Sequence, residues 1–275
     1  MIYANICSEV LDCCDLPIKS IVGNEKVSAD IKEIQLGSYT CGNYFVYILN
    51  HLSCCIEKLP RNVRINLVIP VLAEDQLDTV IKSLSNRKIA TSDISKVIVN
   101  DYGGIELSKK YFFASKVGLG RILFRQYRDF RYPEYAESVL TIHTSEIEMI
   151  SRTVLPKSID IDCIGYNIDL SNISTDMEVY LHHPFVLSTY GHICEFASVS
   201  KEISQKFRPD DVCNHECFSC KIRYSNDDKE YFKMGRGIYY PISCKQDIQI
   251  TGHSIKIIKK PRWECYENIS SAQRI

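Results

Sequence analysis

The sequence predicts an α/β fold: a partial or complete β/α barrel, similar to a TIM barrel, followed by a small β-rich C-terminal extension. Three observations predict it. Apolar runs of strand length alternate with helical segments over residues 31–189, which is typical of parallel βαβ units. The length of 275 residues is close to that of one α/β barrel, roughly 200–250 residues. The six expected strands favour a barrel over two separate domains, and a doubly wound sheet is the alternative.

The expected elements follow one another from residue 31 onward. Each expected strand contains a run of apolar residues, and each expected helix places apolar residues three to four positions apart. Residues 1–30 show neither pattern and are expected to be irregular. The expected strands are 31–37, 64–72, 96–101, 120–126, 159–166 and 177–189. The expected helices are 44–58, 74–84, 105–112 and 145–154.

The sequence pattern changes after about residue 190: several cysteines lie close together there, and the helical periodicity of apolar residues ends. Short polar strands with Gly and Pro follow. We therefore divide the chain into an irregular segment at 1–30, a barrel domain at 31–221 and a β-rich extension at 222–275. The last part of the barrel domain, residues 191–220, is a cysteine-rich loop.

The composition excludes several classes of protein. Hydrophobic residues make up 45% of the chain and charged residues 24%, so disorder or a coiled coil is not its main state. The net charge of −1 argues against general DNA binding, although a local patch for RNA stays open. No window holds about 18 uninterrupted apolar residues, and the N-terminus lacks the pattern of a secretion signal. We expect a cytoplasmic protein without a membrane span, whose thiols stay reduced.

The chain has 13 cysteines, and an odd number in a cytoplasmic protein indicates metal ligands rather than a disulfide framework. Cys194, Cys213, Cys217 and Cys220 lie within residues 191–220, and Cys41 follows the first expected strand. Cys194 follows the last expected strand. The carboxyl ends of barrel strands share one face, so Cys41 and Cys194 can converge there. Four thiolates at that face suit a four-iron, four-sulfur cluster or a structural zinc ion.

Three alternatives to an iron–sulfur cluster remain. Zinc sites often use paired CxxC knuckles, and only Cys217 and Cys220 form such a pair, while His192 and His215 are further zinc donors. Buried free thiols are the second alternative. The C-x3-C-x2-C spacing from residue 213 to 220 also occurs in radical S-adenosylmethionine enzymes. There, however, most of the barrel follows the motif, whereas here only residues 221–275 follow.

Asp101, Arg125 and His183 are candidate catalytic residues. Asp101 ends an expected strand and would point into the barrel mouth, or it simply makes the turn before Gly103. Arg125 lies on the same face of an expected strand as Arg121, and its planar guanidinium suits a carboxylate or a phosphate. A salt-bridged or solvated run is the alternative for these arginines.

Two further pairs lie on expected strands. One residue of the pair His182 and His183 must face the core, where a hydrogen-bonded core histidine is the default interpretation. Asp160 and Asp162 share one face of their strand. They could act as a general acid and base, or serve packing at the strand end.

Several segments in shared order resemble the collagenase-like peptidase family of unassigned catalytic type (the U-thirty-two peptidases), and its ubiquinone-hydroxylation branch in particular. The segments are IQLGSYTC (34–41), VIVNDYGGIELSKK (97–110), GLGRILFRQYRDFRYP (118–133), HHPFVLSTYGHICEFAS (182–198) and GRGIYYP (235–241). The resemblance covers roughly residues 31–241. It departs from the family pattern at Ile193, where relatives have Arg, and in the additional Cys220.

The resemblance implies a barrel-like fold and a four-iron cluster with Cys41, Cys194, Cys213 and Cys217 as ligands. It also implies oxygen-independent hydroxylation of a small aromatic quinone precursor or of an RNA base. An electron donor and, in one branch, a related partner subunit would be required. Cys220 could replace Cys41 as the fourth ligand.

Two functions from different classes follow. The first is an iron–sulfur hydroxylase, or a subunit of one, in which Asp101, Arg125 and His183 position the substrate. The second is a non-catalytic partner or scaffold subunit whose four-cysteine metal site holds the C-terminal part to the barrel. A peptidase is a third alternative that rests on the family name, because the sequence shows no HExxH motif and no Ser/His/Asp order.

Overall fold

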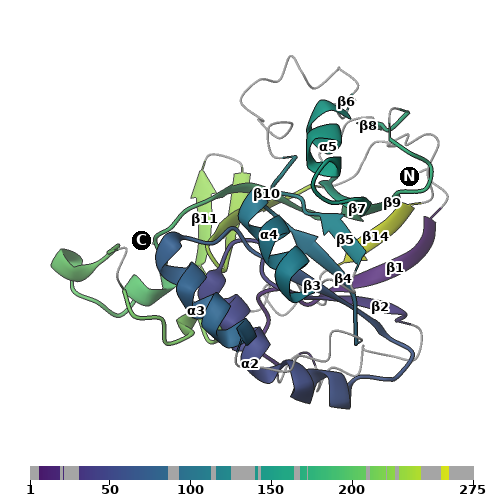
Figure 1. The fold of residues 1–275 in the computed structure, drawn as a ribbon. Helices are drawn as coiled ribbons and strands as arrows, with labels where there is room; N and C mark the ends of the chain where they lie inside the picture. Colours follow the sequence, from purple (N-terminus) through teal and green to yellow (C-terminus); the bar gives the residue numbers. More distant parts are fainter. Residues whose placement is uncertain are drawn as a thin grey trace.

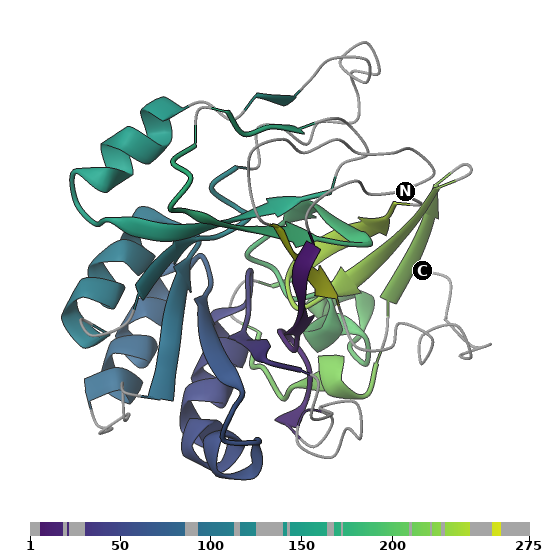
Figure 2. The ribbon, with the colours of Figure 1, turned by 90° about the vertical axis from the view of Figure 1, so that its right-hand side faces the viewer.

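Eight parallel strands close into a barrel in the computed structural model of the chain (Figures 1 and 2). The structure describes residues 6–18, 21, 31–85, 93–112, 116–124, 140–141, 144–163, 168–171, 173–208, 211–220, 222–226, 229–242 and 255–259. The fold is therefore the predicted α/β barrel, and the barrel is complete. Its strands, in order around the barrel, are β1 (Ile6–Asp12), β14 (Ile255–Lys259), β9 (Glu178–His182), β7 (Pro156–Asp162), β5 (Lys116–Leu119), β4 (Ile94–Val99), β3 (Arg64–Ile69) and β2 (Glu33–Gly37).

Helices cover the outside of the barrel beside β2, β3 and β4 (Figure 1). They are α2 (Gly42–Lys58), α3 (Glu74–Ser85) and α4 (Tyr102–Tyr111), with α5 (Thr144–Ser151) before β7. Ile34 and Leu36 of β2 point outward into this apolar layer, where they are fully buried. Because side chains alternate along a strand, Glu33 and Gln35 point into the barrel. No helix in the described ranges is long and apolar enough to span a membrane.

A second, antiparallel sheet follows the barrel in sequence. Its strands, in spatial order, are β10 (Phe185–Tyr190), β13 (Gly237–Pro241), β12 (Lys229–Met234) and β11 (Ile222–Asn226). One face of this sheet packs on the carboxyl ends of the barrel strands. That contact joins Phe185, Leu187, Phe232, Met234 and Tyr239 of the sheet to Tyr39, Val68, Ile98 and Ile122 of the barrel. Two short strands, β6 (Leu140–Thr141) and β8 (Ile168–Asp169), pair with each other as a two-stranded sheet that belongs neither to the barrel nor to the second sheet.

The first and last barrel strands differ from the expectation. We expected residues 1–30 to be irregular and residues 222–275 to form a separate extension, but β1 and β14 pair with each other and complete the barrel. Figure 2 shows the two strands, purple and yellow, side by side. The register joins Val10 to Ile258, a contact between the two ends of the chain that no local pattern reports.

Two expected strands also end differently. The strand expected at 120–126 ends at Leu119, and residues 121–124 form a turn; residues 125 and 126 lie outside the described part. The strand expected at 177–189 is two strands, β9 in the barrel and β10 in the second sheet. Pro184 separates them because it has no N–H to continue a ladder.

Candidate functional site

The four predicted cysteine ligands come from three segments at the carboxyl end of the barrel. Cys41 immediately precedes α2, Cys194 follows β10, and Cys213 and Cys217 lie in the loop 211–220. Burial raises the pKa of the Cys217 thiol. This pKa is raised further by the negative charges of nearby groups, which are Cys41, Asp15, Cys194 and Cys213. Thiols influence one another's pKa in this way only at short range. The fold therefore places these four thiols within electrostatic range of one another, and their role as ligands stays a prediction.

Cys41 is held by a tight turn after β2. The Ser38 Oγ accepts hydrogen bonds from the backbone N–H groups of Thr40 at 3.1 Å and Cys41 at 2.9 Å. Gly37 has φ +119°, and a Cβ there would lie 2.3 Å from the Val68 carbonyl oxygen, so only glycine fits. Burial raises the pKa of the Cys41 thiol to about 12, and Asp15 raises it as well, whereas the nearby Tyr44 amide lowers it.

Cys194 lies where short 3-10 turns present backbone amides. Burial raises the pKa of its thiol and Cys213 adds to the shift, while the backbone N–H of Ala197 and the guanidinium of Arg236 lower it. Backbone amides near a sulfur stabilise its thiolate form, which is the form that binds metal. The environment of Cys194 therefore offers partial compensation for a buried thiolate.

Arg236 is a cation beside the cysteines that the sequence analysis missed. Its side chain is buried and lowers the pKa of both Cys41 and Cys194. With the Gln76 amide oriented so that its oxygen faces the guanidinium, that oxygen accepts from Arg236 at 3.0 and 3.2 Å. The GRG sequence around Arg236 was the available signal, because glycine is favoured where the backbone is left-handed or approaches another residue closely. Gly235 has φ +55°, and a Cβ at this position would lie 3.4 Å from the Cys41 Cβ.

The cysteine region has little internal space. A cavity of about 10 Å³ is lined by Asp15, Cys217, Cys220 and Gly235, among others. That volume is about the size of one water molecule. Within the described part of the chain, no three His, Cys, Asp or Glu side chains surround one point closely enough to hold a single metal ion.

The three predicted catalytic residues have different surroundings. The Asp101 side chain caps α4 by accepting from the Gly104 N–H at 2.6 Å, and burial raises its pKa. This supports the turn interpretation of Asp101. His183 is half-buried at the end of β9, where its backbone N–H donates to the Ile258 carbonyl at 3.2 Å. Arg125 lies outside the described residues.

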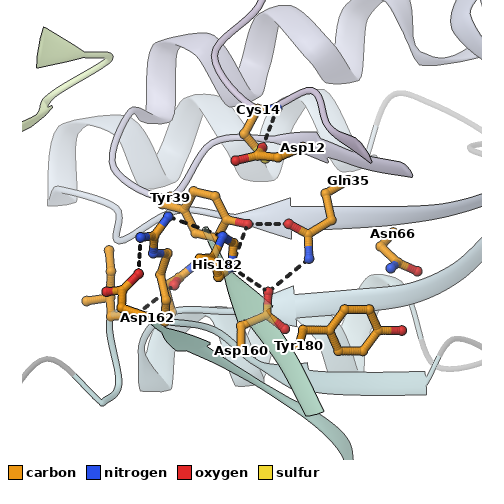
Figure 3. Close-up of polar contacts among 12 residues, drawn as sticks. Asp12, Cys14, Gln35, Tyr39, Asn66, Asp160, Asp162, Tyr180 and His182 are labelled. Carbon is orange, nitrogen blue, oxygen red and sulfur yellow. Dashed lines mark hydrogen bonds and ion pairs between the residues drawn. The ribbon is translucent and has the colours of Figure 1, made fainter. Parts of the chain in front are cut away.

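The inside of the barrel contains a buried polar network that includes Asp160, Asp162 and His182 (Figure 3). The Arg121 guanidinium pairs with Asp162, contacts the His182 Nδ1 at 3.2 Å, and donates to the Phe185 carbonyl at 2.6 Å. Tyr39 and Tyr239 each place a ring 5.4 Å from the guanidinium carbon. Arg121 is only 1% exposed, so its guanidinium does not face solvent and its contacts stabilise the inside of the barrel.

His182 contacts a second carboxylate, Asp160 (Figure 3), and thereby links it to Arg121. Because a guanidinium only donates, the His182 Nδ1 must accept from Arg121, which leaves the Nε2–H to donate to Asp160 Oδ2 at 3.2 Å. The Gln35 amide donates to the same oxygen at 2.9 Å. Asp160 and Asp162 thus share one strand face, as expected, but each has a different partner. His182 is a hydrogen-bonded core histidine.

A ring of charges closes the opposite end of the barrel. The Lys96 and Lys256 ammonium groups bond to Glu178 at 2.6 and 2.7 Å, and both also reach the Tyr180 hydroxyl. Burial by itself would raise the pKa of the Glu178 carboxyl. The two ammonium groups, of Lys256 and Lys96, outweigh burial and lower this pKa to about 2. Lys256 also pairs with Glu33 at 3.0 Å. The charged side chains inside the barrel are therefore largely paired with one another.

We predict that Asp160→Asn changes how stability depends on pH. Burial raises the folded-state pKa of Asp160 from 3.8 to about 7. Between these values the folded protein retains a proton that the unfolded chain has released, so wild-type stability falls as the pH rises through this window. At 1.36 kcal/mol per pKa unit the loss is at most about 4 kcal/mol. The variant lacks this loss.

Urea unfolding at pH 5, 6, 7 and 8 measures the effect. The variant's unfolding free energy, relative to wild type, should rise from pH 5 to about pH 7 and then level off. The Asn amide also lowers the unfolding free energy by an amount that does not depend on pH. The reason is that an amide group at the Asp160 Oδ1 position has no hydrogen-bond partner in the described structure. A difference that stays the same at all four pH values would refute the raised pKa.

An apolar pocket of about 620 Å³ adjoins Cys194. Ile193 and Glu195, on either side of Cys194, line it. The other lining residues are Ser188, Thr189, Phe207, Tyr224, Tyr231 and Ile238. Strand alternation places Tyr224, Tyr231 and Ile238 on the sheet face that points away from the barrel. The volume lies within the usual range for small-molecule sites.

Scans against protein-family models and searches of curated proteins and of solved structures found no match to this chain. The resemblance to the collagenase-like peptidase family therefore stays a prediction from the sequence.

Proposed function

We propose that this chain is an iron–sulfur protein in which Cys41, Cys194, Cys213 and Cys217 hold a four-iron, four-sulfur cluster. The proposal rests on the placement of these cysteines at the carboxyl end of the barrel, where burial and neighbouring thiols raise the pKa of Cys41, Cys194 and Cys217. Cys41 is far in sequence from the other three, which lie within residues 191–220. Their convergence at the barrel face where ligands usually bind agrees with the ligand set that the resemblance implies.

The chemistry of the donor set fits such a cluster. Four soft sulfur donors are the usual ligands of a cubane cluster. Cys41, Cys194 and Cys213 all raise the pKa of Cys217, so thiolates gathered here repel one another unless a cation lies between them. Arg236 and the nearby amides supply part of that compensation, and iron would supply the rest.

The cluster, when bound, would supply one-electron transfer, because four protein thiolates leave no open iron for a substrate. The protein's own residues then have separate tasks. The buried Arg236 guanidinium stabilises the thiolates, and the tight turn at Ser38 holds Cys41 in place. The Phe185 and Tyr239 side chains exclude water from the barrel end.

The finer proposal is oxygen-independent hydroxylation of a small aromatic molecule or of an RNA base, with an external electron donor. The resemblance supports the reaction. The pocket beside Cys194 supports a flat apolar substrate, since Phe207, Tyr224 and Tyr231 line it. The pocket holds one carboxylate, Glu195, which Lys233 neutralises at 2.7 Å. In this proposal the substrate lies on the second sheet rather than in the barrel mouth.

We predict that protein purified without oxygen contains about four irons and four sulfides per chain, and no stoichiometric zinc. Iron, acid-labile sulfide and zinc analysis measures this, together with an absorption spectrum that bleaches on reduction. One zinc per chain without sulfide would contradict the cluster. No metal at all would contradict the cluster and any four-cysteine metal site.

The second candidate function is a non-catalytic partner subunit whose metal site only clasps the second sheet to the barrel. The filled barrel interior and the covered barrel end favour it, because neither leaves space for a substrate. Ile203 and Val212, which lie between Cys194 and Cys213 in the sequence, are 89% and 73% exposed, and exposed apolar surface often marks a protein interface. No observation favours a peptidase.

Redox titration separates the two functions. A catalytic or electron-transfer cluster should take up one electron reversibly and keep its iron. A structural clasp should lose stability when the metal is removed, yet give no reversible electron uptake within the range of cellular donors.

A further inference from the structure

His215 lies between two of the predicted ligands and has an uncommon backbone conformation. It follows Cys213 by two residues and precedes Cys217 by two residues. Its φ of 58° and ψ of 37° lie in the left-handed region. For a residue with a side chain this region is sparsely populated, although Asn, Asp and His adopt it more often than others. The conformation starts the 3-10 turn Glu216–Phe218, which carries Cys217.

Aromatic contacts fix the orientation of the His215 ring. The ring stacks on Phe218, with centroids 5.0 Å apart and an interplanar angle of 12°. On another side it contacts Tyr47 of α2 at 5.0 Å. Tyr47 also contacts Phe218 at 5.0 Å, so the three rings form one group. The cysteine loop is thereby attached to a barrel helix through His215.

This orientation brings one ring nitrogen to a predicted ligand. The His215 Nδ1 lies 3.9 Å from the Cys213 Sγ, which is within reach of a hydrogen bond to sulfur. In the free thiol either atom could donate. A metal-bound thiolate has no proton, so the imidazole Nδ1 must then be the donor.

We propose that His215 is a positioning residue that donates an N–H···S hydrogen bond to Cys213 and raises the reduction potential of the cluster. The inference rests on the proposed function. Reduction adds one negative charge to the cluster, and a hydrogen bond to a ligand sulfur stabilises that added charge. The aromatic group of Tyr47 and Phe218 provides the rigidity, because it holds the donor in place in both redox states.

Two substitutions separate the hydrogen bond from the ring contacts. His215→Phe retains an aromatic ring for Phe218 and Tyr47 but has no donor. His215→Asn loses the stacked ring, retains an N–H donor near the Nδ1 position, and tolerates the left-handed backbone. His51→Phe is the matched control. His51 also contacts the Tyr47 ring, at 4.5 Å, but its Nδ1 lies 2.8 Å from the Tyr47 carbonyl oxygen.

The experiment is a redox titration of the purified full-length proteins, after iron and sulfide have been counted. In His215→Phe we expect the reduction potential of the cluster to fall by about 59 mV. For a one-electron couple this corresponds to about a tenfold higher ratio of oxidised to reduced cluster at a given potential. His215→Asn should retain most of the wild-type potential, and His51→Phe all of it. If Phe strains the left-handed backbone and the variant does not load iron, His215→Gly is the donor-free variant.

The outcomes distinguish this inference from the proposed function. A donor-free variant that carries full iron and sulfide and titrates at the wild-type potential overturns the role of His215 and leaves the cluster intact. The same lowered potential in His215→Asn and His215→Phe would assign the effect to ring packing and also overturn the inference. A wild-type chain without iron and sulfide overturns the proposed function, and the inference with it.

Discussion

Replacing Arg121 with Met is expected to lower the free energy of unfolding by about 3–5 kcal/mol. Arg121 is buried inside the barrel and pairs with Asp162, which is 5% exposed. Removing the guanidinium leaves this carboxylate in the barrel without its cation. It also removes the contact with His182 inside the barrel and the bond to the Phe185 carbonyl, which links the barrel to the second sheet.

Urea unfolding of Arg121→Met, with Lys109→Met as control, measures the effect. Lys109 and Glu106 form an ion pair on α4 with side chains 44% and 67% exposed. The control should therefore change stability by less than about 1 kcal/mol. The double variant Arg121→Met with Asp162→Leu should recover part of the loss, since it removes the uncompensated charge. An Arg121→Met protein within 1 kcal/mol of wild type would show that the buried pair contributes little.

Replacing Cys194 or Cys213 with Ala is expected to remove most of the bound iron and to lower the unfolding temperature of the anaerobically purified protein. The reason is that each thiol supplies one of the four proposed ligands, and metal binding is coupled to folding. Cys163→Ala is the matched control, because Cys163 is a buried thiol, 1% exposed, at the end of β7. It should lose some packing energy but keep its iron.

Cys41→Ala and Cys220→Ala identify the fourth ligand. Cys41 raises the pKa of Cys217 and Cys194 raises that of Cys41, which places Cys41 within the proposed ligand group. We therefore expect Cys41→Ala to lose iron and Cys220→Ala to retain it. The reverse result would make Cys220 the ligand. Full iron in Cys194→Ala, Cys213→Ala and Cys41→Ala would place the metal elsewhere.

Much of the fold was predictable from local patterns. The apolar runs of β3 and β4 and the helical periodicity of α2 and α3 are properties of neighbouring residues, so the sequence displays them directly. The convergence of Cys41 with Cys194 was also predictable. It needs only the rule that the carboxyl ends of parallel strands meet at one face of a barrel.

The polar barrel interior was not predictable in the same way. Glu33 and Gln35 alternate with Ile34 and Leu36, a pattern that is also typical of a strand with one face in water. The closed barrel places the polar side chains inside instead, where Gln35 bonds to Asp160. For the same reason Arg121, first assigned to the same strand face as Arg125, is a buried partner of Asp162 in the turn after β5.

Composition, periodicity and spacing therefore led to an α/β barrel and to a group of converging cysteines. They could not lead to the pairing of β1 with β14, to the position of Arg236 beside Cys41, or to the contact between His215 and Cys213. Periodicity is a property of a few neighbouring residues. Strand closure and site geometry depend on which distant segments meet and in which register, and the packing of the whole chain sets that.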